Sequence, residues 1–304
     1  MSVFPTKILL ATDGSNDAVL AARATADLSR EVGSELHIIH VWQADFARAY
    51  AVTMPGARYR WCKQQAERLL AKQVELVEGA GGKVKEAHLR RGRVTNEIVG
   101  LANELNTDLV VMGSRGLGSV ERLVVGSVSE SVAHKSLRPL LLLRGGPQAW
   151  PPARVVIGVD FTEESLKAAK LASSVGRLFG ARTLLVHAYP LLELAQKSRV
   201  AGVTEADKEV CGAGKALEVL DLRLKLLLGQ DMQTKTVAGD AANSILNASE
   251  EGEEPTMIAI GSRGLGTLKR LTLGSVSDNI LRTAAGPMLI YRQPPSGADT
   301  RTAS

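Results

Sequence analysis

Short apolar runs alternate with amphipathic stretches along the whole chain. The runs at residues 7–12 (KILLAT) and 154–159 (RVVIGV) are apolar and partly β-branched, which is typical of buried strands. A stretch with the apolar spacing of a helix follows each run, and Ser15 and Thr162 are the expected caps at its start. Because buried strands that alternate with helices form parallel sheets covered on both faces, this pattern predicts an α/β fold.

The same order of elements is predicted twice. The remaining elements fall at equivalent places in two copies. The first copy has strands at residues 36–42, 109–112 and 139–144, a short strand that ends near Gly92, and helices over residues 63–79 and from about Asn96. The second copy has strands at residues 183–189, 257–260 and 287–292, a short strand that ends near Gly239, and helices over residues 214–228 and from about Asn243. Gly33 and Gly180 are the expected stops of the first helix in each copy. Each copy is therefore predicted to form one α/β domain.

The repeat is visible in the residues themselves. A shift of 147 residues places Asp13 on Asp160, and beyond a one-residue insertion in the acidic segment 250–254 the shift becomes 148. The segment GSRGLGSVERLVVGSVS at 113–129 then matches GSRGLGTLKRLTLGSVS at 261–277 in 12 of 17 residues. Such internal similarity indicates two tandem domains.

The composition of a short segment marks the boundary between the copies. Residues 145–152 (GGPQAWPP) mix flexible glycine with stiff proline, as linkers do. The sequence thus predicts a first domain over residues 1–146, a linker over 147–152, a second domain over 153–293 and a disordered polar tail over 294–304.

A glycine-rich segment follows the fourth strand of each copy. In the first copy Gly113-Ser-Arg-Gly116 is followed by nine residues and Gly126-Ser127, and in the second Gly261-Ser-Arg-Gly264 by nine residues and Gly274-Ser275. Glycines let backbone N–H groups approach a ligand closely, and the helix that follows adds the positive end of its dipole. Because the whole pattern occurs twice after a strand, it favours phosphate binding over a mere loop.

Other candidate ligand groups lie just past strand ends, where ligands bind in open α/β sheets. Those of the first copy are Asp13, Val41 and Gly113, and those of the second are Asp160, Ala188 and Gly261. The two aspartates could contact a ribose or offset the dipole of the following helix. Arg115 and Arg263 could be phosphate partners or solvated loop charges. We expect each set to converge on one crevice.

The two serines of the pattern have a structural alternative. Ser127-x-x-Glu130 is a capping box and Ser275-x-x-Asp278 resembles one, so either serine could cap a helix without any ligand. Taken alone, each serine is better explained as a helix cap. The spaced pattern as a whole is better explained as a phosphate site.

Composition and charge narrow the function classes. With 45% hydrophobic and 23% charged residues, the chain has the composition of an ordinary globular protein. A net charge of +5 is too small to indicate a nucleic-acid partner, and no apolar run is long enough to span a membrane. Cys62 and Cys211 form no CxxC pair, which fits a reducing compartment and predicts no metal site. Because no apolar stretch of signal-peptide length is present either, the expected location is cytoplasmic. His40 and His187 lie in apolar strands and are expected to be core histidines rather than ligands.

The spaced motif resembles that of the ATP-binding class of universal stress proteins, Gly-x-x-Gly, nine residues, then Gly-Ser. The openings KILLATDGS and RVVIGVDFTEES, and the closing segments GSVSESVAHKSLRPLLLLR and GSVSDNILRTAAGPMLIYR, are also similar to that family over nearly the whole chain. The resemblance implies two flavodoxin-like domains, related to adenine nucleotide alpha hydrolases, each with a five-stranded parallel sheet and helices on both faces. It also implies ATP as the ligand, with or without Mg²⁺.

Carried over by position, the resemblance assigns nucleotide-binding residues in both copies. They are Ala11, Thr12, Asp13, Val41, Met112, Gly113, Arg115, Gly116, Gly126, Ser127, Val128 and Ser129, and Gly158, Val159, Asp160, Ala188, Ile260, Gly261, Arg263, Gly264, Gly274, Ser275, Val276 and Ser277. Phe161 replaces the glycine found at position 14 of the first copy, which puts the shape of the second adenine pocket in doubt. The resemblance further implies that the two domains pair through their apolar last strands, and that two chains could form a dimer.

Three functions remain open from the sequence. A nucleotide-binding regulatory protein with at most slow hydrolysis is favoured, because the chain has no GxxxxGK[ST] motif and no evident catalytic base. An ATP-using enzyme such as a nucleotidyl transferase would need histidine or lysine signatures beside the loop. A nucleotide-free interaction module is disfavoured because both copies keep every glycine. A redox Rossmann enzyme is disfavoured because Asp13-Gly-Ser follows the first strand.

Overall fold

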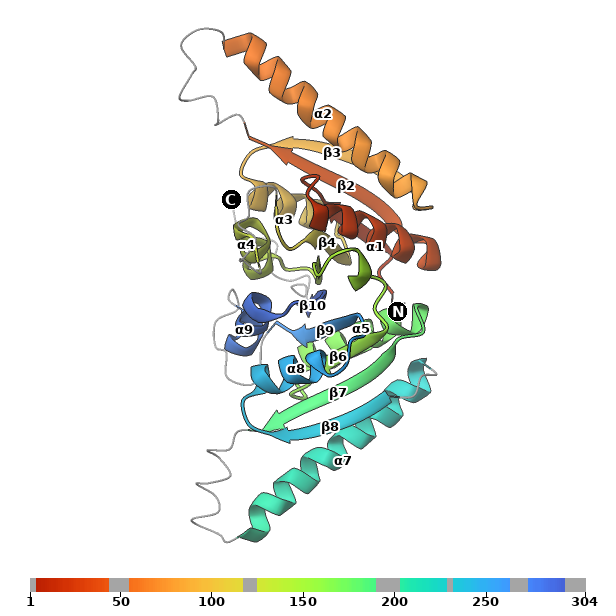
Figure 1. Cartoon of the computed structure of the whole chain (residues 1–304), viewed down its shortest axis with the longest axis vertical. Coiled ribbons are helices and arrows are strands. Elements are labelled where there is room, and N and C mark those ends of the chain that lie inside the picture. Colours follow the sequence, from red (N-terminus) through yellow and green to blue (C-terminus); the bar gives the residue numbers. More distant parts are fainter. Residues whose placement is uncertain are drawn as a thin grey trace. The chain divides into compact units, whose positions relative to one another are not determined.

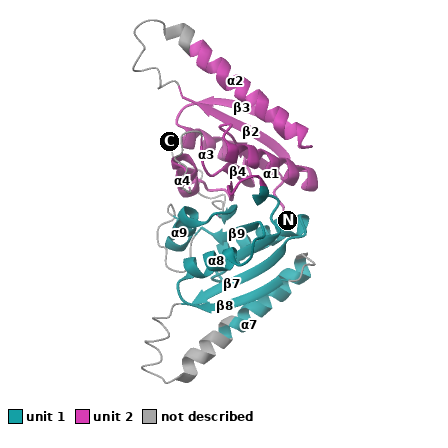
Figure 2. Ribbon diagram, in the orientation of Figure 1, with its two compact units in different colours: residues 1, 3, 148–291 teal, residues 2, 4–147, 292–304 magenta. Residues whose placement is uncertain are grey.

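The computed structural model describes residues 4–43, 55–116, 125–189, 203–228, 232–262 and 273–292. The chain divides into two compact units, one made mainly of residues 4–147 and the other of residues 148–291 (Figure 2). We call them the first and the second domain. The expected disordered tail, residues 294–304, lies outside the described residues.

The first domain alternates strands and helices in the predicted order (Figure 1). Its elements are β1 (Lys7–Ala11), α1 (Asn16–Val32), β2 (Glu35–Trp42), α2 (Pro55–Gly79), β3 (Val84–Arg91), α3 (Val94–Glu104), β4 (Leu109–Gly113), α4 (Ser127–Lys135) and β5 (Leu140–Leu143). Its strands pair in parallel in the order β3-β2-β1-β4-β5. Because right-handed crossovers fix the side of each helix, α1 and α2 cover one face and α3 and α4 the other, and each pair is in contact.

The second domain repeats this plan. Its elements are β6 (Arg154–Gly158), α5 (Glu163–Leu178), β7 (Arg182–Tyr189), α7 (Val203–Leu228), β8 (Met232–Ala238), α8 (Ala241–Glu250), β9 (Thr256–Gly261), α9 (Ser275–Thr283) and β10 (Met288–Tyr291). Its parallel strands follow the order β10-β9-β6-β7-β8. The predicted α/β class and the two flavodoxin-like sheets are thus confirmed. A single turn, η2 (Pro147–Ala149), and a cis Trp150–Pro151 peptide precede β6.

The central strands are buried on both faces, which is why they are apolar along their whole length. The side chains of Ile8 and Leu10 in β1 and of Val110 in β4 are fully buried, as are those of Val155 and Ile157 in β6. The strand order reverses between β1 and β4, and again between β6 and β9. Open α/β sheets bind ligands at such reversals, beyond the carboxyl ends of the strands.

The predicted boundaries of the first helices are confirmed. The Ser15 side chain accepts a hydrogen bond from the N–H of Ala18, and the Thr162 side chain accepts one from Ser165. Gly33 ends α1 in the left-handed conformation, with φ of 71°. Each helix is therefore capped locally by the residue types that the sequence supplies.

Two helices begin earlier than predicted. α2 starts at Pro55 rather than near residue 63, and α7 starts at Val203 rather than at Gly214. Proline is favoured at the first position of a helix, where its missing N–H costs nothing. α7 continues through Gly212 and Gly214, since an interior glycine costs only about 1 kcal/mol. Within the described part of the chain, no helix has both the length and the apolar character needed to cross a bilayer.

Candidate nucleotide site

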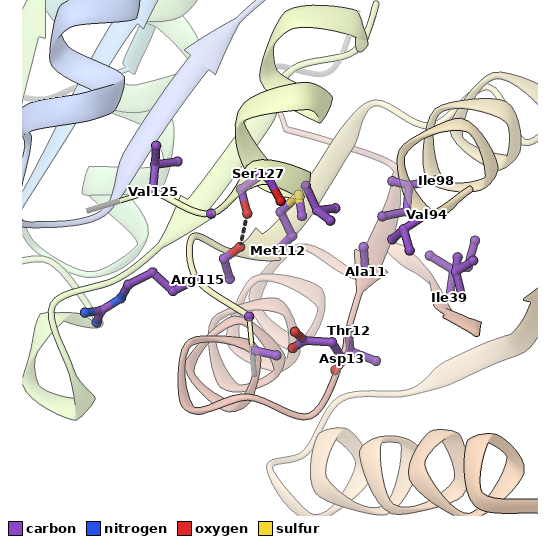
Figure 3. Close-up of a pocket in the computed structure, with 17 residues that line it drawn as sticks. Ala11, Thr12, Asp13, Ile39, Val94, Ile98, Met112, Arg115, Val125 and Ser127 are labelled. Carbon is purple, nitrogen blue, oxygen red and sulfur yellow. Dashed lines mark hydrogen bonds between the residues drawn. The ribbon is translucent and has the colours of Figure 1, made fainter. Parts of the chain in front are cut away.

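A cavity of about 450 Å³ opens at the carboxyl ends of β1 and β4 in the first domain (Figure 3). All twelve residues predicted for the first copy line it: Ala11, Thr12, Asp13, Val41, Met112, Gly113, Arg115, Gly116, Gly126, Ser127, Val128 and Ser129. The expected convergence on one crevice is therefore seen in the first domain.

The two sides of the cavity differ in chemistry. Ile39, Val94 and Ile98 gather on one side, and Ser127 lies on the other, at the start of α4 (Figure 3). Ile39 comes from β2, and the other two apolar side chains come from successive turns of α3. One side therefore suits an apolar ring and the other suits an anion.

The amino end of α4 has no capping side chain. Its N-cap is Gly126, and Ser127 is the first helical residue, with an exposed side chain. The same holds for Gly274 and Ser275 at the start of α9. The interpretation of these serines as helix caps is therefore wrong, because a glycine already occupies the capping position. An uncapped helix start keeps N–H groups and a positive dipole end available to an anion.

Hydrogen bonds close the loop around this helix start. The N–H of Gly126 donates to the carbonyl of Ser114 over 2.7 Å, which joins the two flanks of the glycine-rich loop. The hydroxyl of Ser15 donates to the carbonyl of Arg115 over 2.9 Å, and that of Ser129 to the carbonyl of Gly113 over 2.9 Å. The first of these two contacts ties Arg115 to the start of α1, and the second ties α4 to the end of β4.

Arg115 lines the cavity, but its guanidinium is engaged elsewhere. Nε and Nη2 lie 3.0 and 3.3 Å from the Asp17 carboxylate, which also accepts from the Arg115 backbone N–H. Asp17 is buried, and its hydrogen bond and charge raise the pKa of Arg115. The tip of the Arg115 side chain points away from Asp13 in Figure 3. In this conformation Arg115 is an anchor of the loop rather than a solvated charge.

Two glycines of the motif serve different purposes. A Cβ atom on Gly113 would lie 2.7 Å from the backbone of α1, so this glycine is needed for helix–strand packing. A Cβ atom on Gly116 would lie 2.6 Å from Oδ2 of Asp13. Oδ1 of Asp13 accepts from the N–H of Ser15 over 3.0 Å. Gly116 thus lets the loop lie against the Asp13 carboxylate.

The corresponding cavity of the second domain has a volume of about 90 Å³. Eight of the predicted residues line it: Gly158, Val159, Asp160, Ala188, Ile260, Gly261, Val276 and Ser277. Gly274 and Ser275 form the start of α9 without lining the cavity, and Arg263 and Gly264 lie outside the described residues. The second crevice therefore exists at the predicted place, but it is much smaller.

The two histidines near these sites are both hydrogen-bonded to the backbone; His40 is buried, as predicted, whereas His187 is partly exposed. Nδ1 of His40 lies 2.9 Å from the carbonyl oxygen of Thr12, and Nδ1 of His187 lies 2.7 Å from that of Val159. Each ring thereby donates to the backbone just after the first strand of its domain. Neither is placed as a free ligand group.

The sequence model of the Universal stress protein family matches residues 5–144 and 152–292. The chain belongs to the universal stress protein family. A universal stress protein of Mycobacterium tuberculosis is 25% identical over 298 residues, which are 94% of this chain and 97% of that protein. A putative universal stress protein of Staphylococcus aureus is 34% identical over 138 residues, which are 45% of this chain and 82% of that protein.

A solved structure supports the fold. The crystal structure of a universal stress protein from Archaeoglobus fulgidus aligns with a TM-score of 0.68 and 22% identity, and covers 95% of this chain and 98% of that one. The chain therefore holds two tandem universal stress protein domains, with the α/β fold of the family in each.

Three replacements distinguish the second universal stress protein domain beside its cavity. Gly158 stands where the first domain has Ala11, and a Cβ atom there would lie 2.4 Å from Cδ1 of Ile245, so this isoleucine occupies the space. Phe161 adopts a φ of 61°, and its ring packs 4.9 Å from that of His187. The third replacement is Glu164, which accepts a hydrogen bond from the Ser262 hydroxyl over 2.7 Å.

Sequence reasoning missed five residues that line the first cavity: Ala18, Ile39, Val94, Ile98 and Val125. A signal existed for three of them. Ile39 lies two residues before Val41 and so shares its face of β2, and Val94 and Ile98 are one helical turn apart at the start of α3. The motif alone pointed to strand ends and to the loop, and not to α3.

Proposed function

We propose that this universal stress protein binds ATP in the first-domain cavity and acts as a nucleotide-dependent regulator. The observation that carries the proposal is a single cavity of about 450 Å³ that joins an apolar side to the uncapped start of α4. Pockets for cofactors have volumes of roughly 300–1,000 Å³, mostly apolar walls and a few well-placed polar groups. The cavity meets each of these requirements.

Each part of the cavity has a matching part of the nucleotide. Ile39, Val41 and Ile98 offer an apolar surface to the adenine ring. The Asp13 carboxylate can accept hydrogen bonds from ribose hydroxyls. The first N–H groups of α4, with the Ser127 hydroxyl, can bind phosphate oxygens, as helix starts do. A Mg²⁺ ion bound with the phosphates would rely on Asp13, the one carboxylate among the described residues of the lining.

The lining argues for slow hydrolysis at most. Among the described residues that line the cavity there is no histidine or lysine, and the Arg115 guanidinium is paired with Asp17. A nucleotidyl transferase would need such groups beside the phosphates, so this second candidate is less well supported. We propose the second domain as a weaker site for the same ligand, since about 90 Å³ is below the usual range for ligand pockets.

Mass spectrometry of ligands released from the purified full-length protein by denaturation tests the proposal. An adenine nucleotide is expected, and after its removal ATP should bind again in a calorimetric titration. If no nucleotide is released and added ATP shows no binding, the proposal is wrong. Pairing of the two domains, formation of a homodimer and the cytoplasmic location stay predictions from the sequence.

A further inference from the structure

Four titratable side chains meet on one face of the β2–β3 pair in the first domain, away from the strand ends that form the nucleotide cavity. Glu35 and His37 belong to β2, and Glu86 and His88 belong to β3. The Cα atom of His37 pairs with that of Glu86. Because side chains two residues apart on a strand share a face, all four point to the same side of the sheet. β3 is the edge strand of this domain's sheet, so the cluster lies beside an open edge.

The cluster has the spacing of a metal site. Nδ1 of His37 lies 3.0 Å from Nε2 of His88, and the two rings stack with centroids 5.3 Å apart. Ligand atoms of His37, His88 and Glu86 all lie within 4.8 Å of one another. Two nitrogens bound to one zinc ion at 2.0–2.1 Å in tetrahedral geometry are about 3.3 Å apart. A small outward movement of the rings would therefore admit an ion.

Glu35 fixes the orientation of His37. Nε2 of His37 lies 2.9 Å from Oε1 of Glu35, and an ionised carboxylate can only accept, so Nε2 carries the proton. The lone pair of Nδ1 then faces His88. Glu35 is itself held by Lys7 at 3.3 Å and Lys85 at 2.5 Å. A carboxylate behind a histidine in this manner is the usual support of a metal-binding imidazole.

The fold does not require this cluster. From His37 and Leu184 onward the equivalent strands pair in the same register, with Leu184 opposite Gln233 where the first domain has His37 opposite Glu86; the first domain also has a register shift between Leu36 and His37. The positions equivalent to Glu35 and His88 are Arg182 and Lys235. The second domain thus forms the same strand pair without any of the four side chains, so packing alone does not account for them.

We propose that His37, His88 and Glu86 bind a divalent transition metal ion of the zinc class, with Glu35 as the positioning residue of His37. Two imidazoles and one carboxylate leave a fourth position for water. On binding, Nε2 of His88 gives up its proton to solvent and Nδ1 of His88 takes one up from solvent, so that both imidazoles stay neutral. The side chains of His37 and His88 are 3% and 11% exposed and that of Glu86 is 61% exposed, so an ion can enter from the Glu86 side. The bound ion would fasten the edge strand β3 to β2.

Titration of the nucleotide-free full-length protein with Co²⁺ and Zn²⁺ tests this proposal. We expect one equivalent of Co²⁺ in the first domain, with visible d–d bands and no thiolate charge-transfer band, which excludes Cys62 as a ligand. Zn²⁺ should displace Co²⁺. In the wild-type protein, Zn²⁺ should shift the imidazole ¹⁵N resonances of two of the five histidines, and they should be His37 and His88. Absence of saturable binding, or shifts at other histidines only, would overturn the proposal.

Variants that copy the second domain separate the ligands from their surroundings. His88→Lys should abolish binding, and Glu86→Gln should weaken it at least tenfold. His134→Gln, which removes a histidine outside the cluster, should bind as the wild type does. Binding by folded His88→Lys with wild-type affinity would contradict the assignment; if this variant does not fold, the wild-type resonance shifts decide the question.

A separate variant tests the role of Glu35. Glu35→Gln should weaken Co²⁺ binding about ten- to a hundredfold while the visible bands keep their shape. A merely structural role of Glu35 would instead lower the unfolding temperature of the metal-free protein and leave the Co²⁺ affinity unchanged.

Discussion

The two domains share one order of elements and one glycine motif, but their cavities measure about 450 and 90 Å³. The two linings differ on the motif side as well as in the walls, because Gly126 and Ser127 line the first cavity, whereas Gly274 and Ser275 do not line the second. In the second domain Ile245 fills the space beside Gly158, and Phe161 replaces a glycine with a φ of 79°. The same glycine motif is therefore compatible with cavities of very different volume.

The largest expected difference between the domains concerns the glycine that ends the fourth strand. A Cβ atom on Gly113 would lie 2.7 Å from the backbone of α1, whereas one on Gly261 would lie 3.0 Å from that of α5. Gly113→Ala should lower the free energy of unfolding of the first domain by about 3 kcal/mol, and Gly261→Ala that of the second by about 1 kcal/mol. Hydrogen exchange of amides in β1 and β6 measures the two domains separately. Equal losses would contradict the packing difference.

The next largest change in stability is expected at Asp17 and its counterpart Glu164, the acidic residues near the start of the first helix of each domain. Asp17→Asn removes the charge that holds Arg115, and should cost the first domain about 2 kcal/mol of stability. Glu164→Gln should cost the second domain about 1 kcal/mol, because an amide oxygen still accepts from the Ser262 hydroxyl. Hydrogen exchange of the amides in β1 and β6 measures these two losses of stability.

A double-mutant cycle extends this prediction to Arg115. If Arg115 acts through Asp17, adding Arg115→Ala to Asp17→Asn should lower stability by less than about 0.5 kcal/mol more. A large further loss of ATP affinity in the double variant would show instead that the guanidinium contacts the nucleotide.

The smallest effects separate caps from ligand groups. Ser15→Ala removes a capping hydrogen bond and should cost about 1 kcal/mol of stability. Ser127→Ala should change stability by less than about 0.5 kcal/mol, because Ser127 caps nothing, yet weaken ATP binding by about 1–2 kcal/mol. Thermal unfolding of the two variants measures the change in stability, and calorimetric titration measures the change in ATP affinity. A stability loss in Ser127→Ala as large as in Ser15→Ala would contradict the cap assignment.

Much of the fold was predictable because local chemistry and tertiary structure agree. The apolar strands, the caps at Ser15 and Thr162 and the stop at Gly33 follow from residue type and spacing. The early starts of α2 and α7 could not be predicted, because the variable segments before them carry no strong signal for a helix boundary. The role of Gly126 as N-cap was also missed, since Ser127 followed by Glu130 fits a capping box equally well on paper.

The candidate site was predictable in its position but not in its volume. The spaced motif, the strand ends and the family resemblance together identified twelve of the residues that line the first cavity, but not Ile39 of β2 or Val125 beside Gly126. The contribution of α3 was missed because Val94 and Ile98 are far from the motif in sequence. The packing of Ile245 against Gly158 beside the second cavity was also not predictable, because it is a tertiary contact that no local pattern encodes.

Our central claim is that the first domain provides the tighter ATP site, at the start of α4. A Cβ atom on Gly126 would lie 3.2 Å from the carbonyl oxygen of Ser114, so the branched side chain of Gly126→Val should block the loop and the phosphate approach. Gly274→Val makes the same change at the start of α9 and serves as the matched control. Circular dichroism must show that both variants are folded.

Calorimetric titration of ATP into the wild type and these two variants is the most direct test. We expect a tight phase of one equivalent and a weaker second phase in the wild type, loss of the tight phase in Gly126→Val, and its retention in Gly274→Val. A wild-type isotherm in Gly126→Val, or loss of the tight phase in Gly274→Val, would contradict the central claim.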